Sequence, residues 1–224
     1  MLCNCYYYLL YEKKGYLDMF KIENVCEKIS GYIAQELNFD DDKKAVINYG
    51  IFAFIQMGIC IALVIIFGFI FNVTAEALII SFTISILRKS SGGVHSNSPE
   101  RCAVIGTVVS VGMALISKYV NISLSLSIVL GAIIFIWSYC IVYKLAPIDS
   151  IAKPIKNVKK IKRLKKSSIM ILSVYLIVVI INMLCYSIIK NFALLTYSLC
   201  IYMGLLWQVF SLTKCGHLVI GKLG

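Results

Sequence analysis

The chain has 224 residues, 60% of them hydrophobic, and a mean hydropathy of +0.86. A soluble domain is about 45–50% apolar. The excess therefore excludes a single water-soluble globule and makes lipid the natural solvent for most of the chain. In a membrane protein, a formal net charge of +11 indicates a topology signal rather than nucleic-acid binding, so no nucleic-acid partner is predicted.

The nine cysteines do not indicate a disulfide-stapled secreted protein. Cys60, Cys140, Cys185 and Cys200 lie in apolar runs, where a thiol behaves as a small hydrophobe. The sequence holds no C-x-x-C motif, and two histidines are too few for an obvious zinc site. We therefore expect neither a metal nor another cofactor.

The first residues do not have the pattern of a cleavable signal peptide. The apolar run 5–11 is short, has no basic region before it and ends in charged residues at 12–14. Met19 is an alternative translation start to Met1, and we expect residues 1–18 to be a dispensable extension.

Residues 19–48 are predicted to form an amphipathic helical region that lies on the membrane surface or caps the bundle. Their apolar residues recur at spacings of three and four, as one face of a helix requires. These residues are Ile22, Val25, Cys26, Ile29, Ile33 and Leu37. Asn38 and the acidic run 40–42 predict a break and the N-cap of a second helix.

Six apolar segments follow, which predicts an all-α polytopic membrane protein with one six-helix transmembrane domain over residues 49–224. The segments are 49–71, 73–87, 103–120, 124–145, 169–189 and 192–212. A helix needs about 20 residues to cross the hydrocarbon core, with a range of about 17–25. Because the second and third segments are at or below that length, we expect the polar loop 88–102 between them to dip into the protein at membrane depth.

The basic residues predict the orientation of these segments. With six crossings and an N-terminus inside, only Lys118 and Lys190 among the 22 Lys and Arg residues fall on the outer side. This is a strong positive-inside bias. It predicts that the loops 88–102 and 146–168 and both termini lie in the cytoplasm.

The loop 88–102 carries the parts of a thiol acyl-transfer site. It holds His95 and Cys102, and its run 98–100, Ser-Pro-Glu, is typical of the N-cap and first positions of a helix. Cys102 then lies in the first helical turn, where the helix dipole favours a thiolate. His95 would take the thiol proton and later give one to a leaving amine.

Other loop residues would assist, although simpler interpretations stay open. Arg101 adds positive charge, and Gly92 and Gly93 permit positive φ and close backbone approach, so that their N–H groups would bind an oxyanion. The alternatives are a cysteine that only packs at the start of an apolar span and a histidine that is only solvated. Spacing alone does not show that the two side chains meet.

Four residues of this loop follow the spacing R-x(4)-G-x-H-x(6)-C between two apolar runs: Arg88, Gly93, His95 and Cys102. A later run at 146–149, Ala-Pro-Ile-Asp, is followed by a basic tract within 153–166. Together these motifs resemble the accessory gene regulator B (AgrB) family over about residues 19–212. The resemblance implies a multi-pass bacterial cell-membrane protein that acts as a cysteine endopeptidase in peptide quorum sensing.

The resemblance also implies a substrate and a mechanism. AgrB proteins process an AgrD-type propeptide, which has an amphipathic leader, a short signal core and an acidic C-terminal tail. By this likeness Cys102 is the nucleophile and His95 the base, and the core is left on Cys102 as a thioester. A Cys or Ser of the core then attacks to give a thiolactone or lactone ring, a transfer that a dry site favours over hydrolysis.

Supporting roles are predicted for further residues. Asp149 is a candidate to orient His95, and Arg88, Gly92 and Gly93 are expected to support the site. A basic cluster is expected to dock the acidic tail, or else only to set topology and attract anionic lipid at about 1 kcal/mol per basic residue. The basic cluster consists of Lys159, Lys160, Lys162, Arg163, Lys165 and Lys166.

Two other interpretations of the whole chain stay open. A small membrane transporter would export a signalling peptide without cutting it, but it should show ionisable residues within spans and inverted repeats. The sequence shows few of the former and no evident repeat. A structural membrane subunit with a solvated loop is the third interpretation. The expected partners are the propeptide, the lipid bilayer and, on general grounds, a second copy of the chain in a homodimer.

Overall fold

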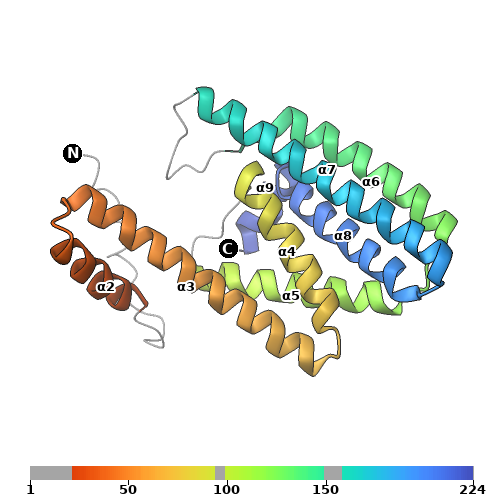
Figure 1. Ribbon diagram of the computed structural model, residues 1–224, viewed down its shortest axis with the longest axis horizontal. Helices are drawn as coiled ribbons and strands as arrows, with labels where there is room; N and C mark the ends of the chain where they lie inside the picture. Colours follow the sequence, from red (N-terminus) through yellow and green to blue (C-terminus); the bar gives the residue numbers. More distant parts are fainter. Residues whose placement is uncertain (1–21, 94–98, 149–157, 224) are drawn as a thin grey trace. The chain divides into compact units, whose positions relative to one another are not determined.

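The computed structural model describes residues 22–93, 99–148 and 158–223, with the backbone alone at 22–23, 99–100 and 220–223. The predicted extension 1–18 lies outside these residues. Within them the chain is helical apart from turns, short connections and one isolated bridge, so the all-α prediction is confirmed there (Figure 1). The helices are α2 (Ile22–Glu36), α3 (Asp41–Ile70), α4 (Thr74–Ser91), α5 (Pro99–Tyr119), α6 (Leu124–Leu145), α7 (Val158–Ile189), α8 (Phe192–Phe210) and α9 (Lys214–Leu223).

The chain divides into two compact units, Met1–Met57 and Gly58–Gly224. The first unit contains α2, so the helix predicted from the apolar spacing of residues 22–37 is present, but its buried face differs from the expected one. Cys26, Ser30 and Ala34 are buried at a spacing of four, whereas Val25 and Ile29 are 50% and 41% exposed. The helical spacing of the apolar residues was therefore predictable from the sequence. The same residues did not show which side of the helix would be buried.

The break between the first two helices lies where the sequence predicted it. Asn38 adopts a positive φ of 49°, and the Asp40 Oδ1 atom accepts a hydrogen bond of 2.9 Å from the Lys43 backbone N–H. Asp40 therefore acts as the N-cap of α3 and satisfies one of its unpaired N–H groups.

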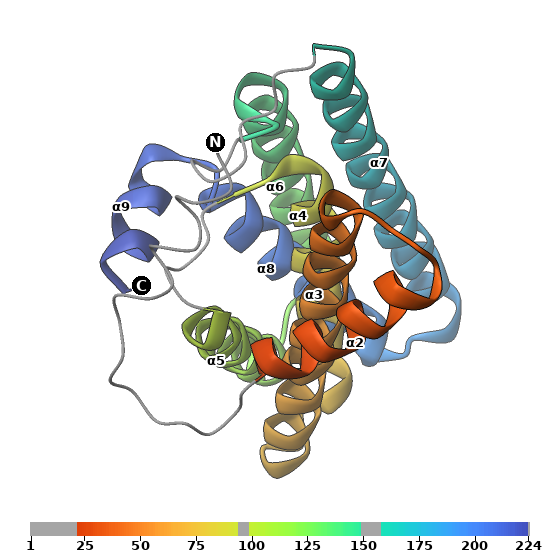
Figure 2. The ribbon, with the colours of Figure 1, turned by 90° about the vertical axis from the view of Figure 1, so that its left-hand side faces the viewer.

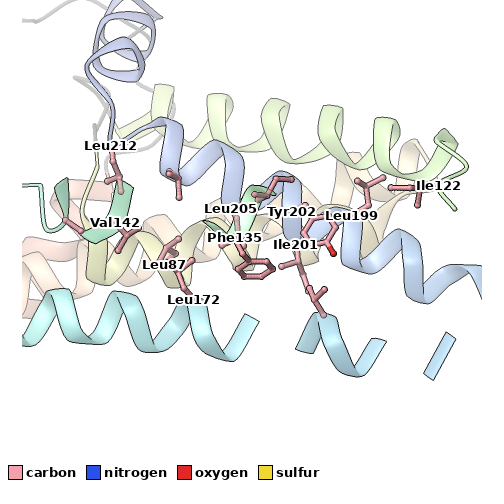
Figure 3. Packing of buried hydrophobic residues seen from close by; sticks show 14 of the residues in the cluster. Leu87, Ile122, Phe135, Val142, Leu172, Leu199, Ile201, Tyr202, Leu205 and Leu212 are labelled. Atoms are coloured by element: carbon pink, nitrogen blue, oxygen red, sulfur yellow. The ribbon is translucent and has the colours of Figure 1, made fainter. Parts of the chain in front are cut away.

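The second unit is a helical bundle in which α8 packs against α4, α5, α6 and α7 (Figures 1 and 2). Figure 3 shows the core of this bundle, where Leu87 of α4, Phe135 of α6 and Leu172 of α7 join the buried side chains of α8. Phe135 meets Tyr202 of α8 edge-on, with ring centroids 6.2 Å apart. The Tyr202 hydroxyl donates to the Ser127 carbonyl at 3.2 Å. Helix α8 is therefore the central helix of this core, and α4 packs against it.

Among the described helices, five are long and apolar enough to cross a membrane: α3, α5, α6, α7 and α8. Apolar side chains such as Phe69 and Ile188 point outward, 77% and 82% exposed, which suits lipid and not water. The chain is therefore a multi-pass membrane protein. The predicted second span, α4, does not qualify because its 18 residues include Glu76, Arg88 and Lys89. The count of six crossings stays a prediction.

The position of α4 explains its lower hydropathy. Ala77, Ile80 and Leu87 of this helix are fully buried, and the helix packs against α5, α7 and α8. A helix that is covered by protein faces little lipid, so it needs a less apolar surface than its neighbours. The last turn of α4, which contains Arg88 and Lys89, lies at one end of the bundle.

Candidate functional site

The end of α4 forms a sharp turn that we call the glycine hook, residues Ser91, Gly92 and Gly93. Gly92 and Gly93 have φ values of 72° and 138°, a region that favours glycine. The Gly92 N–H donates to the Arg88 carbonyl at 2.9 Å and closes the helix. A Cβ atom on Gly92 would lie 2.2 Å from the Ile148 carbonyl oxygen. The predicted positive φ and close backbone approach are therefore both confirmed.

The segment after α6 pairs with the glycine hook. The Ile148 N–H donates to the Ser91 carbonyl at 3.0 Å, and Gly92 and Ile148 form a parallel bridge. The peptide bond between Ala146 and Pro147 is cis. The loops predicted at 88–102 and 146–168 consequently meet at the same end of the bundle.

A fully buried amide of α8 holds the glycine hook from inside the bundle. The Gln208 Nε2 atom donates to the Ser91 Oγ atom at 3.1 Å and to the Gly92 carbonyl at 2.8 Å. The Ser211 Oγ atom lies 3.0 Å from where a Cβ on Gly93 would be. Sequence reasoning missed Gln208 and Ser211. The available signal was a glutamine inside an otherwise apolar run, because a polar side chain at such a position needs a partner.

Arg88 and Cys102 lie side by side in the structure. Arg88 is in the last turn of α4, just beyond the apolar run 73–87, and half-buried Cys102 is in the first turn of α5. Burial lowers the pKa of the Arg88 guanidinium, while the charge of the Cys102 thiolate and a side-chain hydrogen bond to it raise that pKa. Since arginine stays protonated in proteins, Cys102 has a permanent positive charge beside it.

This contact changes the expected source of positive charge at Cys102. The sequence favoured Arg101 for this role, but the Arg101 side chain is exposed, whereas half-buried Arg88 interacts with the sulfur. The predicted start of α5 is confirmed at Pro99, so Cys102 does occupy a first helical turn. His95, Ser98 and Asp149 lie outside the described residues. Within the part that the structure describes, no three His, Cys, Asp or Glu side chains gather in a group suited to a metal ion.

The basic cluster begins α7 and is not part of a loop. The helix starts at Val158, since the lysine-rich stretch has no proline or glycine and consists of good helix formers. All members of the cluster except Lys165 are exposed: Lys159, Lys160, Lys162, Arg163 and Lys166. The Lys165 ammonium instead lies 4.3 Å from the centre of the Tyr143 ring of α6, a cation–π contact. The structure thus separates Lys165 from the solvent-facing residues of the cluster.

Fold and site together define a class: a multi-pass helical membrane protein with a thiol at a helix N-terminus beside a half-buried arginine. The chain belongs to the accessory gene regulator B (AgrB) family, whose sequence model matches residues 26–212. Two Clostridium perfringens proteins named as AgrB-like, from strains SM101 and 13 (both Type A), are each 39% identical to it over 202 residues. These matches cover 89% of this chain and 94% of each relative. No solved structure matches the chain.

Proposed function

We propose that the chain is a membrane cysteine endopeptidase that removes the C-terminal tail of an AgrD-type propeptide and supports cyclisation of the signal core. Membership of the AgrB family supports a role in the processing of Agr quorum-sensing peptides. The observation that carries the proteolytic step is the contact between Arg88 and Cys102 at the start of α5. A positive charge and a helix N-terminus both favour a thiolate, which is the nucleophilic form of cysteine.

The reaction begins when His95 takes the Cys102 thiol proton and the sulfur attacks the carbonyl carbon that joins core to tail. The carbon–nitrogen bond breaks, and the tail leaves as an amine that receives the proton from His95. The core is now a thioester on Cys102. A thiol or hydroxyl within the core attacks this thioester, closes the ring and returns the Cys102 sulfur as a thiol.

One glycine is better suited than the other to bind the oxyanion of this reaction. The Gly92 N–H is already donated to the Arg88 carbonyl, so it is not available to a substrate in this structure. The Gly93 N–H is the remaining candidate of the pair. The glycine hook would then present one backbone donor to the developing charge while Arg88 stabilises the sulfur.

The bridge between Gly92 and Ile148 supports Asp149 as the residue that orients His95. The two segments are parallel at this bridge. Asp149 directly follows Ile148, and His95 follows Gly93 by two residues. Both residues are therefore close in sequence to one of the two paired positions.

We propose that the site and the basic cluster face the cytoplasm, where a newly made propeptide arrives. The positive-inside bias of the sequence supports this orientation. Gly92 and Ile148, one from each loop, are paired with each other, which supports a single orientation for the nucleophile, Asp149 and the basic residues.

Trapping the thioester tests the proposed function. The full chain is reconstituted in lipid vesicles with an AgrD-type propeptide whose core Cys or Ser is replaced by alanine, which blocks ring closure. We expect tail release and a covalent adduct on Cys102 with the mass of leader plus core, cleaved by hydroxylamine. The unaltered propeptide should give cyclic product and little adduct. Transport of intact propeptide across the vesicle membrane without tail release would contradict the proposal and favour a transporter.

Neutralising three exposed residues of the basic cluster tests whether it docks the acidic tail. We expect the combined substitutions Lys160→Gln, Lys162→Gln and Arg163→Gln to raise KM by about tenfold with kcat unchanged, because each lost charge weakens a screened attraction. The dependence of KM on salt should also become weaker. The measurement is tail release at several salt concentrations.

The control for this prediction is a propeptide whose tail carries amides in place of its acidic side chains. Processing of this neutral tail should be insensitive to the three substitutions. An equal loss with both propeptides would contradict tail docking and leave anionic lipid as the group that the cluster contacts.

A further inference from the structure

Gln208 stands out among the buried side chains of α8. Its neighbours in sequence and in the core, such as Leu205 and Val209, are apolar and fully buried, and Gln208 itself is 0% exposed. A buried amide is unfavourable unless it forms hydrogen bonds. The two hydrogen bonds that its Nε2 atom donates both go to one short segment, the glycine hook.

The glycine hook needs the partner that Gln208 provides. The chain leaves the helix at Gly92 with positive φ, so the Gly92 carbonyl is directed away from the helical hydrogen-bond pattern and into the bundle. The carbonyl is partly buried, and the Gln208 Nε2 atom donates a hydrogen bond to it at 2.8 Å. Since a carbonyl only accepts, this contact also fixes which end of the amide faces the hook.

The hydroxyl of Ser91 completes the arrangement. It donates to the Leu87 carbonyl at 2.9 Å and accepts from Gln208 at 3.1 Å. The amide therefore binds both the last helical residue and the first residue beyond the helix. Two bonds from one rigid group define the direction in which the chain continues.

That direction matters because Gly93 lies against both Gln208 and Arg88. A Cβ on Gly93 would be 3.3 Å from the Gln208 Nε2 atom and 3.6 Å from the Arg88 Nε atom. Arg88 in turn interacts with Cys102. Gly93 is therefore close both to the buried amide of α8 and to Arg88, the residue that interacts with the proposed nucleophile.

We propose that Gln208 is a positioning residue, which holds the glycine hook so that Arg88 stays against Cys102 and the Gly93 N–H faces the reacting carbonyl. This inference rests on the proposed function for its catalytic meaning. Gln208 touches neither substrate nor sulfur in this scheme, and it acts through the hook. A role limited to joining α8 and α4 would predict a loss of stability alone.

The substitution Gln208→Met tests the proposal, because it keeps the length of the side chain and removes both hydrogen bonds. The matched control is Tyr202→Phe, which also removes one buried hydrogen bond of α8 but has no contact with the hook. We measure the melting temperature of the reconstituted full chain, the kcat and KM of tail release, and the rate at which iodoacetamide alkylates Cys102 at pH 7, read by mass spectrometry.

We expect Gln208→Met to lower kcat by about tenfold or more with KM unchanged, and to slow Cys102 alkylation. Tyr202→Phe should change the melting temperature by a similar amount while kcat and alkylation stay close to wild type. Ser91→Ala, which removes one of the two amide contacts and is the milder change, should lie between wild type and Gln208→Met in both readouts.

Alkylation of Cys102 at the wild-type rate in both Gln208→Met and Ser91→Ala would overturn the proposal, and so would a fall in kcat no larger than that of Tyr202→Phe. Because alkylation needs no propeptide, this outcome is distinct from failure of the proposed function. If the proposed function itself were wrong, the wild-type chain would release no tail at any rate of Cys102 alkylation.

Discussion

Replacing Cys102 with alanine is expected to abolish tail release, with a fall of at least about 10⁴-fold to the uncatalysed background. The substitution removes the atom that attacks the carbonyl and carries the core as a thioester. It leaves the α4–α8 core unchanged, since Cys102 is only half-buried at the start of α5. The measurement is quantitative mass spectrometry of released tail after reconstitution with an AgrD-type propeptide.

Two companion substitutions make this result specific. Cys140→Ala and Cys215→Ala each remove an exposed thiol and should leave tail release at the wild-type rate. His95→Ala should cost nearly as much as Cys102→Ala, because a nucleophile and its base act as one unit. Tail release by Cys102→Ala at the rate of the two control variants would contradict the thioester mechanism.

Much of the local structure was predictable because it depends on neighbours in the sequence. The helix start at Pro99, the N-cap at Asp40 and the positive φ of Gly92 all follow from the chemistry of a few adjacent residues. The apolar runs likewise predicted helices. Where several helices compete for one core, this local information no longer decides which faces and which helices are covered.

The central place of α4 shows where prediction from apolarity ends. Its run 73–87 is short and less apolar than the others, so the sequence predicted a span at or below the length needed to cross the membrane. Packing against α5, α7 and α8 makes it one of the most covered helices. The hydropathy of a segment measures how favourably it would transfer into lipid. It does not show how much of the segment is covered by other helices.

The contacts of the site depend on distant parts of the chain, so they were not predictable in detail. Gln208 is 116 residues from Gly92 in sequence, and nothing in the spacing of either segment points to the other. Arg88 was suggested only by the resemblance to a family, whereas the structure gives the physical reason, its contact with Cys102. The basic cluster was expected in a loop but begins α7, and its packing on α6 separates Lys165 from its exposed neighbours.

The substitution Gly92→Ala is expected to reduce tail release by about 100-fold, which is the size of loss that a displacement of about 1 Å in a catalytic group produces. Gly92 has a φ of 72° and a ψ of −154°, a conformation that costs a non-glycine residue about 1–3 kcal/mol. Its new Cβ would also lie 2.2 Å from the Ile148 carbonyl oxygen. Since Gly92 and Ile148 are paired in the bridge, this clash requires one of the two paired segments to move.

Either movement separates the parts of the proposed site, because one segment leads to His95 and the other to Asp149. Gly112→Ala is the matched control, as its added methyl group meets nothing within 4 Å and alanine favours the helix by about 1 kcal/mol. This control should keep wild-type activity and at least wild-type thermal stability. Equal rates of tail release in Gly92→Ala and Gly112→Ala would show that the bridge between Gly92 and Ile148 is not needed to bring His95 to Cys102.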